Sequence, residues 1–554
     1  MYKLIFIPLL LSFNAWTYTP DWSSEFVLKE GQNRENIYKL SKAELRDYKK
    51  QGLIHALKYP IDISGLYIPY YPIKNVLKED QRNPFKKILQ EVAGNITGLR
   101  NIDDMYDWLG LPPFNNNDQV EGIYQIPYPE GVKPDYRMGA SIIDTEFGKA
   151  LTFSCAACHS TQLFGKSIMG LPNKKSRANH FFVVGKKVAG LVHPKLFQAF
   201  TKATDEETLM FKRSRDNLKY VGARDPRVLG LDTAAAQVGL SLYNRGKDPY
   251  ARKEKPVGRR KPHPLKRFVA DSKPMPWWNL KYKTKWLSDG SVVSGNPILM
   301  NFIWNEIGRG TDLEELQTWF DENEHKVEEL TAAVFATHAP KWIDFFPENS
   351  ININSAKRGE ILFNRSCKKC HGTYEKGWSS PFSLFKSKRD QIATTKVIYH
   401  KITPVKDVGT DPQRYQAIKF LEKDMNRLKI NQMANIKMEA QKGYVPPPLV
   451  GIWARYPYFH NNSIPNLCAI LTPPEARPIV FYHGPAKNIK TDYDQDCVGY
   501  PVGNKMPRSW KKLKNAKFDT RKKGLSNKGH SKFLSKYTWS KQDKSDLIEY
   551  LKTL

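Results

Sequence analysis

The sequence predicts a mainly α-helical fold in two domains with long ordered loops. Helical periodicity is strong at 313–335, 355–363 and 539–554, strand-like alternation is rare and short, and one five-residue motif occurs once in each part of the chain. At 554 residues, with 40% hydrophobic and 26% charged side chains, the chain is long enough for more than one hydrophobic core. We therefore predict domains over 18–345 and 346–554.

The repeated motif is Cys-x-x-Cys-His, the attachment sequence of a c-type haem. Two thiols at this spacing form thioethers with the two vinyl groups of one haem, and the histidine that follows becomes an axial ligand of the iron. The first copy comprises Cys155, Cys158 and His159, and the second comprises Cys367, Cys370 and His371. The two copies predict two covalently attached c-type haems and electron transfer between them.

Two other kinds of site use Cys-x-x-Cys pairs. Four cysteines can hold a structural zinc ion, and a redox-active dithiol has the same spacing. Neither needs a histidine directly after both pairs. The two Cys-x-x-Cys pairs of a zinc ribbon lie about 15–20 residues apart. The two motifs of this chain, at 155–159 and 367–371, are much further apart in the sequence. The haem interpretation is therefore favoured over both alternatives.

The N-terminus is typical of an export signal. Lys3 supplies a positive charge and residues 4–13 form an apolar core of suitable length, which predicts a signal peptide over 1–17. The segment is shorter than a membrane span, and the alternative is an uncleaved segment that acts as a weak anchor. Export agrees with the haem motifs, because c-type haems are attached outside the cytoplasm. We therefore expect a periplasmic or secreted protein.

The remaining cysteines and the charge give weaker indications. Cys468 and Cys497 are candidates for a disulfide in an oxidising compartment, with two free buried thiols as the alternative.

The formal net charge is +31, and it is concentrated at 252–285 and 505–536. We expect a lysine-rich solvated surface there. The functional alternatives are steering of a small acidic redox partner and adhesion to an anionic membrane surface, whereas no motif predicts binding to nucleic acid.

Helical patterns lie next to both motifs. The segment 355–363 leads to the second motif, with Ser355 as a candidate N-cap, and it resembles the opening helix of a class I cytochrome c. The segment 147–153 approaches the first motif in a similar way. Ser540 is a candidate N-cap of a helix over 539–554, which in cytochrome c domains packs across the opening helix. The resemblance implies two class I cytochrome c-like haem domains.

Further segments resemble a known family. Residues 456–467 (Tyr-Pro-Tyr-Phe-His-Asn-Asn-Ser-Ile-Pro-Asn-Leu) and the preceding 443–453 are similar to a segment of di-haem cytochrome c peroxidases and their MauG-like relatives. The whole arrangement more closely resembles the rubber-oxygenase-type di-haem cytochromes. Asn462 stands where the family usually has glycine. Asparagine tolerates a left-handed backbone better than most residues, so we expect the turn to survive.

This resemblance implies different roles for the two haems. The haem on His159 would be reactive, with an open or exchangeable position for a small-molecule oxidant, either peroxide or O2. The haem on His371 would have two protein ligands and relay electrons. The sequence thus predicts a peroxidase- or oxygenase-like oxidoreductase. A pure electron carrier with both irons fully ligated is the main alternative, and a binder of anionic surfaces is a third.

The second ligand of the haem on His371 has several candidates. By resemblance, His530 is the first choice and His460 is its main rival. A methionine is another option, because Met/His ligation is common in cytochromes c. The available methionines are Met433, Met438 and Met506.

No catalytic residue is identified by the sequence. Glu146 and Glu306 are candidate proton donors, although we expect both to be solvated surface carboxylates. Trp277 and Trp278 are candidates for a position between the haems, either as electron relays or as packing against a porphyrin edge.

Overall fold

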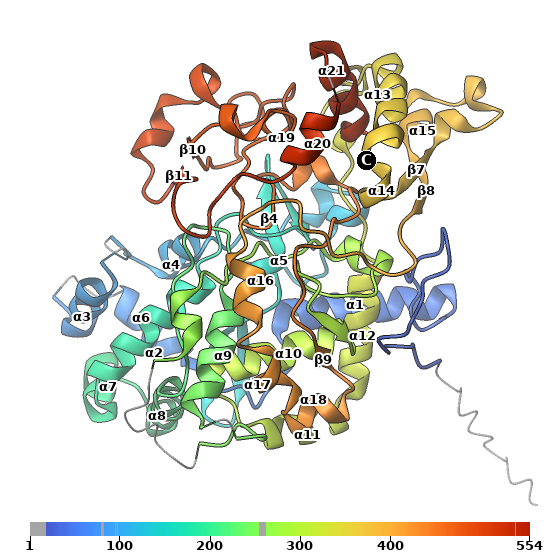
Figure 1. Ribbon diagram of the computed structural model, residues 1–554. Coiled ribbons are helices and arrows are strands. Elements are labelled where there is room, and N and C mark those ends of the chain that lie inside the picture. Colours follow the sequence, from blue (N-terminus) through green and yellow to red (C-terminus); the bar gives the residue numbers. More distant parts are fainter. Residues whose placement is uncertain are drawn as a thin grey trace, which may run out of the picture.

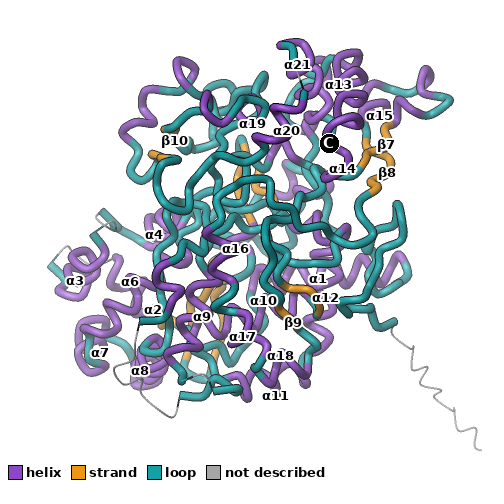
Figure 2. Tube along the Cα trace, in the orientation of Figure 1, coloured by secondary structure: helices purple, strands orange, loops and turns teal. Residues whose placement is uncertain are grey.

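The computed structural model describes residues 18–554 except 79–81, 95, 97, 247, 254–261 and 538. The predicted signal peptide and the basic run 259–261 lie outside the described residues. Helices and loops predominate in the part that is described, and strands are few and short (Figure 2). The prediction of a mainly α fold is therefore confirmed.

Most helices of the first part of the chain lie in the lower half of Figure 1. Their bounds are α1 (Lys42–Lys58), α2 (Tyr70–Lys78), α3 (Pro84–Ala93), α4 (Ile102–Leu109), α5 (Ala156–His159), α6 (Ala178–Leu191), α7 (Pro194–Thr201), α8 (Asp205–Leu218), α9 (Ala234–Asn244), α10 (Pro297–Arg309), α11 (Leu313–Glu322) and α12 (Glu324–Phe335). Ser41 and Glu44 form a capping box that starts α1, and each side chain satisfies a backbone N–H that the helix leaves free.

The later helices divide between two places. Their bounds are α13 (Ile353–Ser366), α14 (Lys368–His371), α15 (Lys388–Ile392), α16 (Gln413–Ile418), α17 (Glu422–Asn426), α18 (Lys429–Met433), α19 (Leu467–Ile470), α20 (Ser531–Lys536) and α21 (Lys541–Lys552). Figure 1 shows α16, α17 and α18 in the lower half near α9 and α10, whereas the other six lie in the upper half.

The strands form small antiparallel sheets. Their bounds are β1 (Ile68–Pro69), β2 (Ala140–Thr145), β3 (Gly148–Phe153), β4 (Ser160–Leu163), β5 (Lys166–Met169), β6 (Val292–Ser294), β7 (Thr373–Lys376), β8 (Thr394–Ile398), β9 (Lys437–Met438), β10 (Val480–Tyr482) and β11 (Lys517–Asp519). One sheet has the order β1-β3-β2, and the pairs are β4–β5, β6–β9, β7–β8 and β10–β11. The first motif is followed directly by β4, and the second is followed by Gly372 and then β7.

Two hydrophobic cores occupy the lower and upper halves. The lower core contains side chains of α1, α9, α10 and α12, and it receives buried residues of 417–438 from the later part of the chain. The upper core is built mainly from 342–554, with Leu171 and Trp278 added from the earlier part. The chain therefore passes between the cores more than once, and the domain boundary at residue 345 stays a prediction.

The last helix packs across the helix that leads to the second motif. A Cβ on Gly359 of α13 would lie 2.0 Å from the backbone oxygen of Asp546 in α21, so the two helices touch there. Arg358 donates two hydrogen bonds to the Asp546 carboxylate, at 2.7 and 2.8 Å. Phe363 packs on Tyr550 with ring centroids 5.3 Å apart. The helix contact predicted from the sequence is present, and it fixes where α13 delivers the second motif.

The expected N-caps have different outcomes. Ser540 accepts a hydrogen bond from the backbone N–H of Asp543 and caps α21, as predicted. The prediction for Ser355 is wrong, because Asn352 caps α13 by accepting from the backbone N–H of Ser355 at 3.0 Å. The Ser355 hydroxyl instead donates to Asp546 across the helix contact.

The expected helical approach to the first motif is also wrong. Residues 148–153 form β3, which pairs with both β1 and β2. Gly148 adopts a φ of 99°, and it pairs with Thr145 across a tight turn, which favours a hairpin. Pairing on both edges of β3 therefore overrides the local helical pattern.

The helical segment 313–335 is interrupted. Asn323 ends α11 by donating its side-chain amide to the carbonyl of Trp319 at 2.8 Å, and α12 begins at the next residue. Asparagine competes with the backbone for hydrogen bonds, which disfavours it inside a helix. The single predicted helix is therefore two.

The basic stretches are only partly a solvated surface. Lys511, Lys512 and Lys514 are exposed, as expected. Lys281 and Lys283 are 3% and 2% exposed, so the expectation fails at the end of the first stretch. No helix in the described part of the chain is both long and apolar enough for a membrane crossing.

Gly359→Ala is expected to lower the midpoint of thermal unfolding, because the added methyl group does not fit between α13 and α21. Overpacking of this kind costs about 1–3 kcal/mol. Gly185→Ala is the matched control: Gly185 also lies within a helix, α6, but a Cβ there meets no atom nearer than 3.9 Å. The control should be neutral or stabilising. Equal midpoints in calorimetry would contradict the close helix contact.

Candidate haem sites

Both motifs form a single helical turn, α5 and α14. The backbone N–H of His159 donates to the carbonyl of Cys155 at 3.1 Å, and that of His371 donates to Cys367 at the same distance. Positions i, i+3 and i+4 of a helical turn lie on one face. Each turn therefore presents two thiols and an imidazole to the same side, which is the arrangement that covalent haem attachment needs.

The second motif is held between α13 and a tight turn. The backbone N–H of Cys367 donates to the carbonyl of Phe363 at 2.7 Å, so the motif continues directly from α13. Gly372 follows with a φ of 76°, and a Cβ there would lie 2.4 Å from the backbone oxygen of Ile398 in β8. Glycine is thus required at the point where the chain leaves the motif and enters β7.

A cavity of about 590 Å³ opens beside the second motif. This volume falls within the range of about 300–1,000 Å³ that is usual for cofactor sites. Its wall includes Cys367, Cys370 and His371, together with apolar side chains from several elements. The apolar residues include Phe363, Leu449, Ile452, Phe459, Leu467, Leu471, Leu547 and Leu551. Two thiols, an imidazole and a large apolar space suit a c-type haem.

His371 is oriented by one backbone acceptor. Its Nδ1 lies 2.8 Å from the carbonyl oxygen of Pro447 and donates to it. Burial lowers the pKa of His371 to about 4, so the ring is neutral at neutral pH. A neutral imidazole whose Nδ1 donates to a carbonyl has its Nε2 available as a metal ligand.

His530 faces His371 across the cavity. The two rings are within 8° of parallel, and their centroids are 6.4 Å apart. This separation would allow one metal ion to be held between two imidazole nitrogens at about 2.0–2.1 Å each. Phe459 also stacks on His530, with ring centroids 5.3 Å apart. Burial lowers the pKa of His530 to about 3, which also keeps this ring neutral.

His460 has a different environment in the same cavity wall. It stacks on Tyr444 with ring centroids 3.7 Å apart, and its backbone carbonyl accepts from the N–H of Lys273 at 2.6 Å. Burial lowers its pKa to about 3. The structure thus brings His371 and His530 together and assigns His460 a stacking contact. The ligand assignment itself stays a prediction.

The proposed methionines do not line this cavity. Met433 is 67% exposed, Met438 belongs to the lower core, and Met506 packs against the upper core. Met275, which the sequence analysis did not single out, lies in the cavity wall. Its only sequence signal is its position between two prolines, the second of which precedes the tryptophan pair.

The first motif is buried within the lower half. Burial raises the thiol pKa of Cys155 to about 11 and that of Cys158 to about 12. Burial also lowers the pKa of His159 to about 4, while the backbone carbonyl of Met275 acts in the opposite direction. The imidazole of His159 is therefore neutral and can serve as a ligand.

One short segment contacts both motif regions. Trp277 packs on His159 with ring centroids 5.5 Å apart, and it is only 4% exposed. Met275, Pro276 and Asn279 line the cavity of the second motif. Trp278 is fully buried in the upper core and donates its indole N–H to Val450. The segment 275–279 thus contacts both sites, through Trp277 at the first and through Met275, Pro276 and Asn279 at the second.

Glu306 is not a surface carboxylate. It is fully buried, and it accepts hydrogen bonds from Tyr59 at 2.5 Å and Ser64 at 3.2 Å, among others. Arg309 lies 3.4 Å from it and donates to the carbonyl of Phe153, two residues before the first motif. The expectation fails because two stretches far apart in sequence, 59–65 and 309–311, enclose the carboxylate. Glu146 lies exposed in the β2–β3 turn, as expected.

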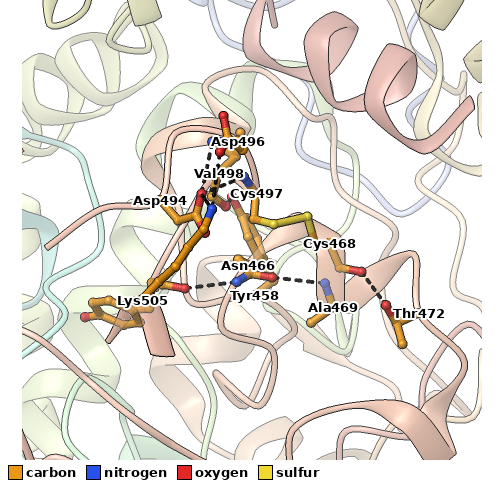
Figure 3. Close-up of a disulfide and its surroundings, with 11 residues drawn as sticks. Tyr458, Asn466, Cys468, Ala469, Thr472, Asp494, Asp496, Cys497, Val498 and Lys505 are labelled. Carbon is orange, nitrogen blue, oxygen red and sulfur yellow. Dashed lines mark hydrogen bonds and ion pairs between the residues drawn. A yellow bond between two sulfur atoms is a disulfide. The ribbon is translucent and has the colours of Figure 1, made fainter. Parts of the chain in front are cut away.

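A disulfide lies next to the part of the cavity wall that Leu467 forms. Cys468 and Cys497 are bonded, with Cα atoms 5.0 Å apart (Figure 3). Asn466 caps the short helix α19 by accepting from Ala469 at 3.0 Å. The predicted disulfide is thus confirmed, and it ties down α19, whose Leu467 contributes to the wall.

The turn at Asn462 survives as expected. Asn462 adopts a φ of 59°, in the left-handed region, and its side-chain amide donates to the carbonyl of Gly230 at 3.4 Å. This turn follows Phe459 and His460 and thus helps to place the aromatic wall of the cavity.

Comparisons with known proteins agree with this site. Residues 443–482 match a family described as RoxA-like, cytochrome c-like. The chain is 27% identical over 270 residues to the uncharacterized protein y4iJ of Sinorhizobium fredii (strain NBRC 101917 / NGR234), covering 39% of this chain and 41% of that protein. It is 36% identical over 127 residues to the uncharacterized protein y4iM of the same strain, covering 21% of this chain and 28% of that protein.

These matches have a limited extent. The aligned part of the chain spans less than half the length of either relative. The matched segment 443–482 supplies Tyr444, Pro447, Phe459 and His460 to the cavity wall beside His371. The match supports a RoxA-type cytochrome c with a c-type haem, and it points to haem-based oxidoreductase or cytochrome function.

Proposed function

We propose that this protein is an exported di-haem c-type cytochrome that acts as a peroxidase- or oxygenase-like oxidoreductase. The observation that carries the proposal is the parallel pair His371 and His530, which face each other across an apolar cavity of about 590 Å³. Part of the wall of that cavity comes from the segment 443–482, which has a cytochrome c-like match. The two cysteine pairs support two covalent attachments, and the four thiols are not in disulfides.

The two sites would have different tasks. Haem iron with an open coordination position binds peroxide or O2, whereas iron closed by two protein ligands mainly transfers electrons. His371 and His530 would supply both axial nitrogens in the large cavity, and the apolar wall would exclude water. Cys155, Cys158 and His159 would hold the reactive group at the first site.

Trp277 is the candidate relay between the two sites. Its ring packs on His159, and its neighbours Met275 and Pro276 line the other cavity. A buried aromatic ring in this position shortens the path between the two attachment sites. A purely structural role for Trp277, in which it packs against a porphyrin edge, is compatible with the same contacts.

The location and partners follow from weaker observations. The disulfide between Cys468 and Cys497 supports an oxidising compartment, so the protein would be periplasmic or secreted. The net charge of +31 supports an acidic redox partner or an anionic membrane surface. The oxidant would be peroxide or O2. A pure electron carrier remains the alternative function.

Covalent haem is expected at both motifs, so intact-protein mass spectrometry should show two haem additions on the purified chain. A Cys367→Ala/Cys370→Ala double variant should retain one, and a Cys155→Ala/Cys158→Ala variant should retain the other. The two variants serve as controls for each other. A single addition on the unaltered chain would remove the di-haem proposal.

His530→Gly is expected to convert one low-spin ferric signal to high spin in electron paramagnetic resonance, because the second axial nitrogen is lost. Glycine suits this position, since His530 has a φ of 67°. His460→Ala is the matched control, because His460 lies in the same wall but stacks on Tyr444. Conversion by His460→Ala and not by His530→Gly would reverse the ligand assignment.

Cyanide binding distinguishes the two candidate functions, an enzyme and an electron carrier. The oxidised protein is expected to show one high-spin iron that becomes low-spin when cyanide is added, because the site on His159 would keep an open position. The signal assigned to His371 and His530 should not change. Two low-spin irons that are indifferent to cyanide in both redox states would favour the carrier.

A further inference from the structure

Three basic side chains line the large cavity without an acidic partner. Lys283 is 2% exposed, whereas Arg455 and Lys273 are half-buried. No carboxylate of the described residues forms an ion pair with any of these three side chains. Burying a charged group that has no partner costs roughly several kcal/mol for each ion. An anion that binds in this cavity would remove that cost.

Several other buried cations in the structure have partners. Arg414 lies 2.6 Å from the carboxylate of Asp289, and both are almost fully buried. Arg309 lies 3.4 Å from Glu306. Arg245 has no carboxylate but donates to three backbone carbonyls, including that of Ile307. Lys174, outside this cavity, is an exception, because its buried Nζ has no hydrogen-bond partner in the described structure.

The donors of these side chains are incompletely used. The ammonium group of Lys283 has three donors, and its recorded contact is the thioether sulfur of Met275 at 3.2 Å, which is a weak acceptor. Arg455 donates one N–H to the carbonyl of Pro448 at 2.8 Å, while its buried Nε has no partner in the described structure. Lys273 differs, because its ammonium donates to the carbonyls of Arg455 and Pro457.

Burial lowers the pKa values of both Lys283 and Arg455. It lowers the pKa of Lys283 to about 7, with the nearby Arg455 charge acting in the same direction. It lowers the pKa of Arg455 to about 10. Desolvation by burial is the first cause of both changes, and a carboxylate placed between the two groups would oppose both.

We propose that Lys283 and Arg455 bind the two propionate carboxylates of a haem in this cavity and thereby help to set its reduction potential. The inference rests on the proposed function, because it requires the haem on His371. A guanidinium group matches a carboxylate with its planar donors, and an ammonium group pairs with a second carboxylate as a point charge. Cys367 and Cys370 would anchor the haem, and both cations line the same cavity as these two cysteines.

The proposal predicts an electrostatic effect on the iron. A positive charge close to the ring favours the ferrous state, which carries one positive charge less than the ferric state. Arg455 is near enough to His371 to disfavour a positive charge on that ring. Removing either cation while its propionate stays ionised should therefore lower the potential of this haem.

The test is a spectroelectrochemical titration of the low-spin haem in the full-length holoprotein. Lys283→Met and Arg455→Gln are each expected to shift the equilibrium at least tenfold towards the ferric form, which is 59 mV for a one-electron couple. Lys283→Arg keeps the charge and should restore most of the potential. Lys532→Gln is the matched control, because Lys532 also lines the cavity but is exposed, and its shift should be small.

Each outcome bears on one claim. Mass spectrometry first establishes that a haem is attached at Cys367 and Cys370; its absence overturns the proposed function and this inference with it. If the haem is attached and low-spin, a potential unchanged by Lys283→Met and Arg455→Gln overturns only the propionate assignment. A variant that does not fold is replaced by its conservative counterpart, Lys283→Gln or Arg455→Lys. The former should again lower the potential, and the latter should retain more of it than Arg455→Gln does.

Discussion

The hydrogen bond from His371 to the carbonyl of Pro447 is the contact on which the site depends. It joins the one-turn helix of the second motif to the segment that forms the cavity wall. With Nδ1 engaged, Nε2 is left available, and the ring lies within 8° of parallel to that of His530. The packing of α13 against α21, through Gly359 and Asp546, fixes the motif from behind. The ligand and its cavity are thus positioned by contacts between segments far apart in the sequence.

Burial has opposite consequences for the two kinds of basic group at this site. It keeps His371 and His530 neutral, and the neutral imidazole is the form that binds metal. The same burial makes Lys283 and Arg455 costly as free cations. A cofactor that supplies a metal centre and carboxylates would satisfy both requirements at once, which explains how ligands and cations can share one apolar cavity.

The segment 273–279 makes the two sites interdependent. Trp277 packs on His159 while Met275 and Asn279 line the cavity beside His371. A displacement of this segment would therefore be felt at both sites. The two cores likewise exchange chain segments, since 417–438 packs in the lower core and Trp278 in the upper one. The two parts of the chain are consequently not independent of each other in their packing.

The sequence by itself determined the local features. Cys-x-x-Cys-His becomes a one-sided triad in a single helical turn, so its geometry needs no distant contact. The cap at Ser540 and the left-handed turn at Asn462 are local in the same sense. The spacing of the cysteines and the helical periodicity were sufficient to predict these elements and the mainly α fold.

The tertiary structure decided everything that depends on the path of the chain. Which of His530 and His460 faces His371 follows from loops that the local pattern does not specify. The strand at 148–153 forms because β1 and β2 offer hydrogen bonds on both of its edges. Glu306 and Lys283 are buried because distant segments close over them. Burial and pairing are properties of neighbours in space, and sequence periodicity records only neighbours along the chain.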